Sequence, residues 1–544
     1  MKKYHLFVCS LLFLFPFLLH AKEYKKEVIV YGNSSGAVTA AVQAAKAGKE
    51  VLFISTDPCI GGLTASGLGA TDINEFSAIG GLSREFYQRI YTFYENPSRW
   101  VCQDKEEYFT SITKRVFTGR NKEASMQWVF EPHVAQQIFK EMLAEHSTIE
   151  IIFDRLQIPG GVKKKGEKIE KVYLASGNSC QGKVFIDASY EGDLMAHSGV
   201  SYFVGRESNQ QYGETMNGIL PNNHVKKSAF KIDPYRVEGK PDSGLLPFVE
   251  PRQPGQPGEG DKRLQAYCFR FTLTDNPQNR RPIEKPVDYE PMWYEYIARL
   301  LKANPNWTLT NVLTITPMPN RKSDINHADF VGANYEWPEA SYARREEIKS
   351  MHRSFTLGLI WFLANDPRVP ASIQNEMHRW GLAKDEFKDN GNFPYQLYVR
   401  EARRMISDYV MTEHEVTGTK KAPYPIGLGT YWFDSHIVSR FVDETGALRD
   451  EGGFWGKQTV YPIGYQSIVP KKKECTNLLV PVCLSASHAA YGSIRMEPVY
   501  MALGQSAGMA ASLAIDTRTN VQDISYDRLK EKLLETGQLP EWNK

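Results

Sequence analysis

The sequence predicts an α/β fold in which a Rossmann-like domain is assembled from two distant parts of the chain, with an α+β domain inserted between them. Residues 28–54 read as a strand, a glycine- and serine-rich turn, a small-residue helix and a second strand. This order is typical of a dinucleotide-binding βαβ unit. A second small-residue helix, begun by Pro498 and continuing to residue 511, stands near the other end of the chain.

The turn between the first strand and helix has the pattern G-x-S-x-x-A. Gly32 permits the tight bend, and Ser34 occupies the position where a second glycine normally lets a phosphate approach the backbone. Ala37 still permits close packing of the helix on the strand, because its methyl group is small. We predict that a dinucleotide binds here through Gly32, Ser34, Ser35, Gly36 and Ala37. An ordinary glycine turn is the alternative.

The first 21 residues are typical of a secretory signal peptide. Lys2 and Lys3 precede an apolar run over residues 6–19, and Ala21 stands before the expected cleavage point. The run is short for a membrane span, and we expect no span after cleavage. The sequence therefore predicts an exported protein, located in the periplasm if the source is a Gram-negative bacterium.

The mature chain divides by composition. Residues 219–262 are rich in Pro, Gly and Lys, which is typical of long loops, and residues 336–386 have a helical pattern. We predict the first part of the nucleotide-binding domain at residues 24–205, an inserted substrate or cap domain at 206–424, the second part at 425–520, and a C-terminal helix and tail at 521–544.

The composition of the chain also limits the classes of partner that it is expected to bind. Charged residues make up 24% of the 544 residues and the net charge is +2, so no strong field favours nucleic acid, and we expect no such partner. Aromatic residues make up 12%. That share fits clefts that stack on carbohydrate as well as a large core. The cysteines lack CxxC spacing, and we expect no metal site.

Several blocks spread over the mature chain carry a family resemblance. They stand at residues 61–72, 80–87, 130–135, 185–194, 397–405, 484–488 and 495–498. In these blocks the chain resembles the FAD-dependent oxidoreductase family of glutathione-reductase-like flavoproteins. The resemblance implies bound FAD and redox chemistry on a small-molecule substrate. It does not identify the electron acceptor.

The resemblance assigns residues of the first part of the chain to FAD. Gly61, Gly62, Leu63 and Thr64 offer backbone to the flavin or its pyrophosphate, with a plain loop as the alternative. Asp187 and Ala188 end a strand that returns beneath the FAD, unless Asp187 only caps a helix.

Two more FAD contacts are expected elsewhere. Ser55 stands where an acid usually binds the ribose hydroxyls, with Asp57 two residues on. The C-terminal helix is expected to approach the flavin through Gly504, Gln505, Ser506, Ala507 and Gly508. Tight packing against another helix would produce the same small-residue pattern.

His436, His488 and Arg495 are the candidate catalytic residues. His436 follows Asp434 in an aromatic loop and is suited to relaying protons. His488 lies in a small-residue loop near Arg495, and a cation beside the flavin would stabilise the anionic reduced ring. A purely structural role is the alternative for either histidine.

Residues 395–412 are predicted to form a helix with three arginines on one face. Arg400, Arg403 and Arg404 stand at i, i+3 and i+4. They either pair with local acids such as Glu401 or offer bidentate donors to a ligand.

These observations predict an exported FAD-dependent oxidoreductase in which N5 of the flavin accepts hydride from a C–H bond. The aromatic content and the exported address favour a carbohydrate or a related hydroxylated substrate. One alternative is a glycan-binding or polysaccharide-processing protein in which FAD is structural or absent. Another is a flavoprotein that performs no redox step.

Overall fold

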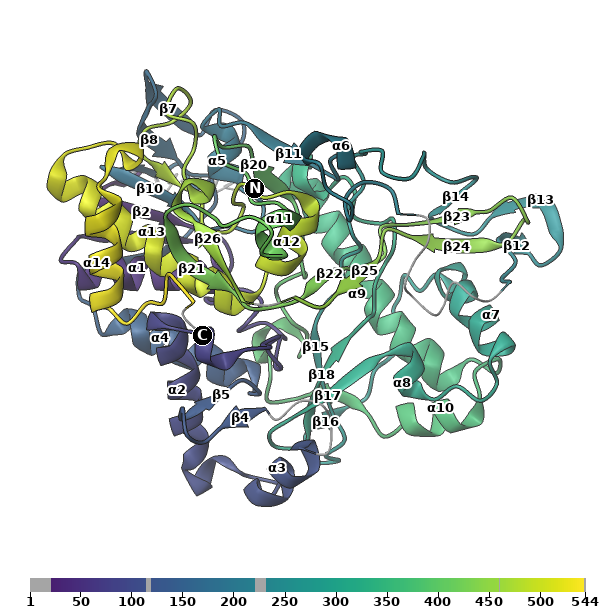
Figure 1. Ribbon diagram of the computed structural model, residues 1–544. Helices are drawn as coiled ribbons and strands as arrows, with labels where there is room; N and C mark the ends of the chain where they lie inside the picture. The colour runs from purple at the N-terminus through teal and green to yellow at the C-terminus, as the bar shows by residue number, and fades with distance from the viewer. Residues whose placement is uncertain (1–20, 114–118, 221–230, 459, 543–544) are drawn as a thin grey trace, which may run out of the picture.

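The computed structural model describes residues 21–113, 119–220, 231–458 and 460–542 (Figure 1). Apart from Ala21, the predicted signal peptide lies outside the described residues, so its cleavage stays a prediction. None of the helices within these ranges combines the length and apolar character that a membrane crossing requires.

A five-stranded parallel sheet forms the centre of the first lobe. Its strand order is β27-β10-β2-β3-β6. The strands are β2 (Val28–Tyr31), β3 (Val51–Ser55), β6 (Ile149–Phe153), β10 (Val184–Asp187) and β27 (Leu478–Leu479). Every residue of β2, β3 and β10 is buried, as expected for a parallel sheet covered on both faces. The prediction of an α/β, Rossmann-like fold is confirmed.

Helices α1 (Ser35–Lys46) and α13 (Glu497–Thr517) pack with their backbones almost in contact. They are the purple and yellow helices that lie side by side in Figure 1. A Cβ atom on Gly504 would lie 2.1 Å from the carbonyl oxygen of Gly36, and one on Gly508 would lie 2.4 Å from that of Ala40. This approach requires glycine, so the helix packing accounts for the small residues of α13.

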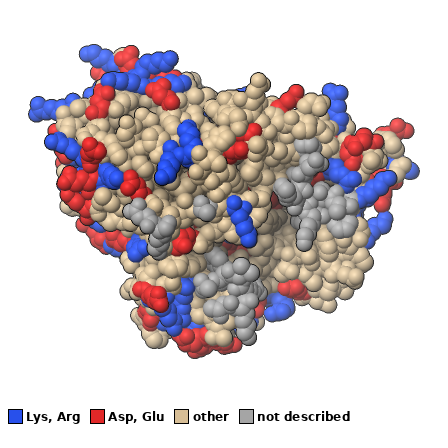
Figure 2. Space-filling model, viewed as in Figure 1, with Lys and Arg blue, Asp and Glu red and all other residues tan. Residues whose placement is uncertain are grey.

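Helices α2 (Gly81–Glu95) and α4 (Pro132–Ala144) cover the same side of the sheet, and α4 begins at Pro132 as its sequence predicts. A smaller sheet has the order β1-β9-β8-β7. Its strands are β1 (Glu23–Lys25), β9 (Ser179–Gln181), β8 (Lys168–Tyr173) and β7 (Val162–Lys165). Basic and acidic side chains gather around the β7–β8 hairpin, whereas most of the visible face carries no charged residues (Figure 2).

The second lobe is built from the middle of the chain. Its antiparallel sheet has the order β16-β19-β15-β18-β17. The strands are β15 (Phe271–Thr274), β16 (Arg280–Arg281), β17 (Thr314–Met318), β18 (Lys322–Asn326) and β19 (Gly381–Ala383). Helices α7 (Glu295–Ala303), α9 (Tyr342–Asn365) and α10 (Ala371–Met377) lie in this lobe. The helical pattern over residues 336–386 is confirmed, whereas the exact domain boundaries stay predictions.

The helix predicted over residues 395–412 is wrong. Its central residues form β20 (Arg403–Met405), which pairs with β11 (Tyr202–Val204). The three arginines are buried and bind carboxylates, but only one of these, Glu401, is a local acid of the kind that one predicted alternative named. Arg403 pairs with Asp193 and Glu339, Arg404 with Glu207 and Glu401, and Arg400 with Asp329. Most of these acids are distant in sequence, so local periodicity could not reveal the strand.

The α1–α13 contact yields a first prediction. Gly504→Ala should lower the free energy of unfolding by about 1–3 kcal/mol, because the new methyl group collides with the backbone of α1. Urea unfolding at equilibrium measures the effect. Gly427→Ala is the matched control, since a Cβ there has no neighbour closer than 3.5 Å. Equal unfolding midpoints in the two variants would contradict the prediction.

Candidate active site

The glycine turn lies at the carboxyl end of β2, where parallel sheets bind ligands. Gly32 has a φ of +122°, and a Cβ there would lie 2.5 Å from the carbonyl carbon of Ala188. Ser34 caps α1 by accepting an N–H of its first turn at 3.1 Å, and it donates to the carbonyl oxygen of Ala188 at 2.6 Å. The N–H of Gly61 donates to the same turn at 2.9 Å. The structure therefore brings four predicted residues together at the N-terminus of a helix.

Asp187 holds the loop that crosses this turn. Its carboxylate accepts the N–H and the hydroxyl of Ser189 at 3.1 and 2.6 Å, and the N–H of Met195 at 2.7 Å. Burial raises the pKa of Asp187 to about 6, although these donors favour the ionised form. Met195 belongs to the short helix α5 (Asp193–His197), so Asp187 serves the helix start that the sequence gave as its alternative role.

Glu497 is the central acid of the turn, and the sequence analysis did not single it out. Its buried carboxylate accepts hydroxyl hydrogen bonds from Ser35 at 2.6 Å, Thr64 at 2.8 Å and Tyr190 at 2.8 Å. Burial raises the pKa of the Glu497 carboxyl. The first residue of α13 is thereby joined to the first residue of α1.

Tyr190 lies over the second glycine pair. Its hydroxyl accepts the N–H of Leu63 at 2.9 Å, and a Cβ on Gly62 would lie 2.3 Å from the same oxygen. The backbone of Gly61 to Thr64 is thus approached as closely as only glycine permits.

A small cavity of about 70 Å³ opens beside the turn, at the carboxyl ends of β2 and β3. Asp57 lines it, together with Asn33 and Thr56. Ser55 is fully buried, and its hydroxyl donates to the backbone carbonyl of Asp57 at 2.6 Å. Of the two residues considered for the ribose, Asp57 is therefore the one that faces open space.

The predicted residues of α13 contact protein. Gly504 and Gly508 face α1, as described above, and Ala507 is buried in the core. Gln505 accepts the N–H of Leu82 at 2.8 Å, and Ser506 donates to the carbonyl of Ile426 at 2.7 Å. These contacts match the alternative of tight helix packing. It is the N-terminal end of α13 that reaches the turn.

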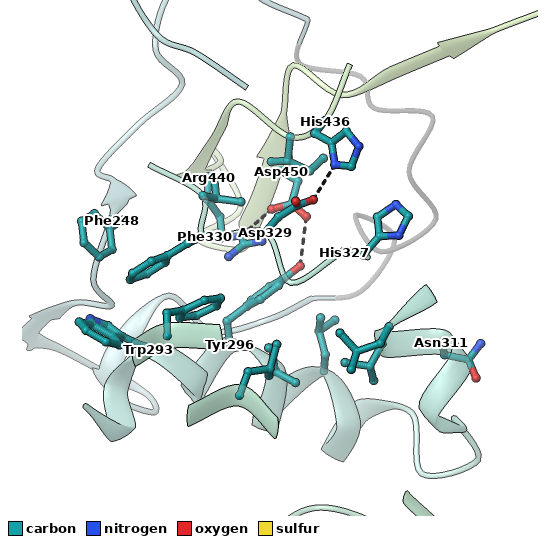
Figure 3. A pocket seen from close by; sticks show the side chains of 18 of the residues that line it. Phe248, Trp293, Tyr296, Asn311, His327, Asp329, Phe330, His436, Arg440 and Asp450 are labelled. Carbon is teal, nitrogen blue, oxygen red and sulfur yellow. Dashed lines mark hydrogen bonds and ion pairs between the residues drawn. The ribbon is translucent and has the colours of Figure 1, made fainter. Parts of the chain in front are cut away.

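A second, larger cavity of about 400 Å³ is lined by side chains from several segments between residues 246 and 455 (Figure 3). Strand β22 (Phe433–Ser435) forms one wall, and Asp434, Ser435 and His436 all line the cavity. Its volume falls in the range of small-molecule sites.

His436 faces this cavity in a pair with Asp329. The distance from Nδ1 of His436 to Oδ2 of Asp329 is 2.7 Å, and the ring lies 5.3 Å from that of His327. Burial opposes the ionisation of Asp329, but Arg400 and His436 together hold its pKa below the usual range. The ionised carboxylate fixes the orientation of the imidazole.

His488 is placed differently. It is 1% exposed and is not among the described residues that line the cavity. Its Nδ1 lies 2.7 Å from Oε2 of Glu401, and its Nε2 lies 3.5 Å from the hydroxyl of Ser435. Burial opposes the ionisation of Glu401, but His488 and Arg404 lower its pKa to about 2. His488 therefore supports the cavity wall from behind.

Arg495 joins the cavity to the glycine turn. It donates to the hydroxyl of Tyr398 at 2.7 Å and to the carboxylate of Asp434 at 3.0 Å. Two residues further along the chain, Glu497 binds the turn. Of the three catalytic candidates, His436 thus lies in the cavity, His488 lies behind its wall, and Arg495 binds the wall through Asp434.

A cluster of two buried glutamates and one exposed histidine has the spacing of metal ligands. It comprises Glu131, His133 and Glu386. The ammonium group of Lys322 lies 2.7 Å from both glutamates and from Asp385. Lys322 therefore supplies the positive charge that a metal ion would supply.

The chain matches the model of one known protein family. The model described as FAD dependent oxidoreductase matches residues 27–533, which include the glycine turn and α13. The chain belongs to this family. FAD is therefore its cofactor and the protein is an FAD-dependent oxidoreductase, as the sequence resemblance implied.

Similar solved structures include p-nitrophenol 4-monooxygenase from Pseudomonas putida, at 10% identity over 34% of this chain and 45% of that chain, with a TM-score of 0.20. L-proline dehydrogenase from P. horikoshii matches at 16% identity over 34% and 59%, with a TM-score of 0.23. A variant of PqsL from P. aeruginosa matches at 10% identity over 94% and 92%, with a TM-score of 0.32. The chain spans about half the length of the first two. These scores carry no argument about activity, and no curated protein matches the chain.

The residues around the turn fit the nucleotide part of FAD. The N-terminus of α1 at the carboxyl end of β2 suits a pyrophosphate, and Asp57, which lines the adjacent 70 Å³ cavity, suits the ribose hydroxyls. The Nε atom of Arg495, close to the start of α13, is buried and has no hydrogen-bond partner among the described residues. A buried donor of this kind is suited to an anionic ligand group.

The assignment of the ribose to Asp57 is testable. Asp57→Asn should weaken FAD binding about 10-fold or more, because a charged hydrogen bond is lost, while the amide oxygen still accepts the N–H of Cys59. Titration of the deflavinated protein with FAD, followed by flavin fluorescence, gives the affinity. Ser55→Ala is the control and should bind FAD almost normally. Weaker binding in the serine variant than in the Asp57 variant would reverse the assignment.

The buried Asp187 carboxyl predicts a pH dependence of stability. Its folded pKa of about 6 lies above its unfolded pKa of about 3.9, so between these values the folded protein retains a proton that the unfolded chain releases. Stability should therefore fall by about 3 kcal/mol as the pH rises from about 4 to above 6. Asp187→Asn should remove this component in urea unfolding at several pH values, whereas Asp242→Asn, at an exposed position, should keep it.

Proposed function

We propose that this FAD-dependent oxidoreductase is exported and oxidises a small hydroxylated organic compound bound in the 400 Å³ cavity. The observation that carries the proposal is that Arg495 binds Asp434 on the cavity wall while Glu497, two residues along the chain, binds Ser35 at the glycine turn. Asp434 therefore borders the space for a substrate, and Glu497 borders the turn at the N-terminus of α1 where we place the nucleotide of FAD. We call this turn the nucleotide cradle.

His436 is the residue that we assign to the proton of the substrate hydroxyl. Because Asp329 is ionised and binds Nδ1, that nitrogen keeps its hydrogen, and Nε2 is the ring atom suited to accept a proton. Asp329 then stabilises the imidazolium that forms. Arg400, at 3.1 Å from Asp329, holds the carboxylate in place.

When bound, FAD supplies the acceptor for hydride from a substrate C–H bond. Arg495 contributes a buried positive charge on the cofactor side of the wall, which suits negative charge that develops there. His488 and Glu401 keep Ser435 and its strand in position. This division of labour follows from burial, since His436 reaches the cavity and His488 does not.

The electron acceptor is part of the proposal. An exported enzyme has no ready supply of NADPH, so a quinone, a periplasmic electron carrier or oxygen is the more suitable oxidant. The aromatic lining of the cavity supports a carbohydrate or a related hydroxylated compound as the substrate. The decisive experiment is anaerobic bleaching of the bound flavin by a panel of sugars, alcohols, acids and amines. Binding of sugars without bleaching would favour a glycan-binding protein that performs no redox step.

The two histidines should differ in kinetics. His436→Gln should slow anaerobic flavin reduction about 100-fold or more, because the group that accepts the substrate proton is lost, and the remaining rate should rise with pH as hydroxide replaces it. His488→Gln should mainly destabilise the wall and lower substrate affinity. Stopped-flow absorbance of the flavin gives both rate and affinity, with exposed His378→Gln as the control. Normal reduction in the His436 variant would remove it from the mechanism.

A further inference from the structure

The large cavity has two chemically different ends (Figure 3). Aromatic rings gather at one end, where Phe248, Trp293 and Phe330 lie together. Charged and imidazole groups gather at the other, where His327, Asp329 and His436 lie on the opposite side of Figure 3. Both sets line one continuous space of about 400 Å³, so a ligand that fills it meets both.

The aromatic end is a built wall. The rings of Phe330 and Phe355 stack with centroids 4.0 Å apart and an angle of 7°. Phe248 and Trp293 each meet Phe330 nearly edge-on, with centroids 5.1 Å away. Leu300 and Leu359 complete this end. Such a wall offers flat faces and edges to another ring and few groups to a hydroxyl.

The polar end presents groups that are already oriented by one another. His436 binds Asp329, as described above. Between the two ends, the Nε of Arg440 lies 2.5 Å from Asp450, and its guanidinium lies over the ring of Tyr296 at 3.8 Å. The hydroxyl of Tyr296 donates to the same Asp450 at 3.2 Å. Each charge is matched by an opposite one, so the end suits neutral hydroxyl groups better than a net anion or cation.

We propose that the substrate is an amphiphilic alcohol, in which a hydroxylated part is joined to an aromatic ring or an apolar ring of similar size. This inference rests on the proposed function, because the same cavity is taken as the substrate site. The hydroxylated part lies at the His436 end, which Asp434 and Arg495 connect to the FAD cradle. The apolar ring lies against Phe330 and Trp293 and anchors the molecule.

A plain sugar fits this cavity less well. Its ring can stack on the aromatic side chains, but its hydroxyls at that end would have no hydrogen-bond partners. A purely apolar ligand would remove water from the paired charges of the other end without replacing its hydrogen bonds. A molecule with both parts meets each end with matching chemistry.

The test compares matched ligands by calorimetry on the holoprotein, anaerobically reduced so that no turnover occurs. Phenyl β-glucoside should bind at least about 10-fold more tightly than methyl β-glucoside, because the phenyl ring buries apolar surface. The pair 2-phenylethanol and ethanol repeats the comparison with a smaller polar part. Lack of preference for the aromatic member in both pairs, including lack of any binding, overturns the proposal.

Variants locate the aromatic contact. Phe248 is 41% exposed at the rim of the cavity, so Phe248→Ala should fold and should reduce the phenyl-to-methyl affinity ratio about threefold or more. Trp293→Leu should reduce it further. Phe153→Ala is the matched control, since Phe153 is 59% exposed on β6, outside the cavity. An unchanged ratio in both cavity variants overturns the proposed orientation and site.

The outcomes separate this inference from the proposed function. Tight binding of phenyl β-glucoside with no flavin bleaching by any alcohol would refute the oxidation and leave the cavity chemistry standing. Bleaching by methyl and phenyl compounds with equal affinity would refute the amphiphilic preference and leave the oxidation standing.

Discussion

The contact between the backbones of α1 and α13 is the constraint on which both sites depend. Gly36, Gly504 and Gly508 permit it, since a Cβ on any of them would lie within 2.7 Å of a backbone oxygen on the facing helix. The contact fixes where α13 begins. Because Arg495 and Glu497 flank that beginning, the geometry of the cavity wall and of the nucleotide cradle is set by the same helix pair. Two segments more than 450 residues apart in sequence thereby act as one support.

Buried ion pairs then hold the inserted lobe against the sheet. Asp193, just after β10, binds Arg345 of α9 at 2.6 Å and Arg403 of β20 at 2.8 Å. All three side chains are nearly inaccessible, so desolvation offsets much of their attraction. Removal of one partner would leave a buried charge, and that penalty makes the pairing selective. The network therefore links the first lobe to α9 and β20 and disfavours arrangements that separate these charges.

The elements that could be predicted from the sequence are those with a local residue pattern. The strand, turn and helix at residues 28–46 and the helix after Pro498 follow from glycine, alanine and proline spacing, and the structure has them. The helix predicted around Arg403 failed, because β11 and distant carboxylates select a strand there. Glu497 escaped notice for a related reason. Its three partners are hydroxyl groups from separate segments, and the sequence around Glu497 does not indicate that they bind it.

The two histidines show how burial separates residues that look equivalent in sequence. Each has a carboxylate 2.7 Å from Nδ1, and each stands near β22. Only His436 borders the cavity, whereas the second nitrogen of His488 faces the hydroxyl of Ser435 within the protein. A proton accepted by His436 can therefore leave through the cavity, and a proton on His488 has no such route. The same type of His–carboxylate pair is thus suited to proton transfer in one place and to support of the wall in the other.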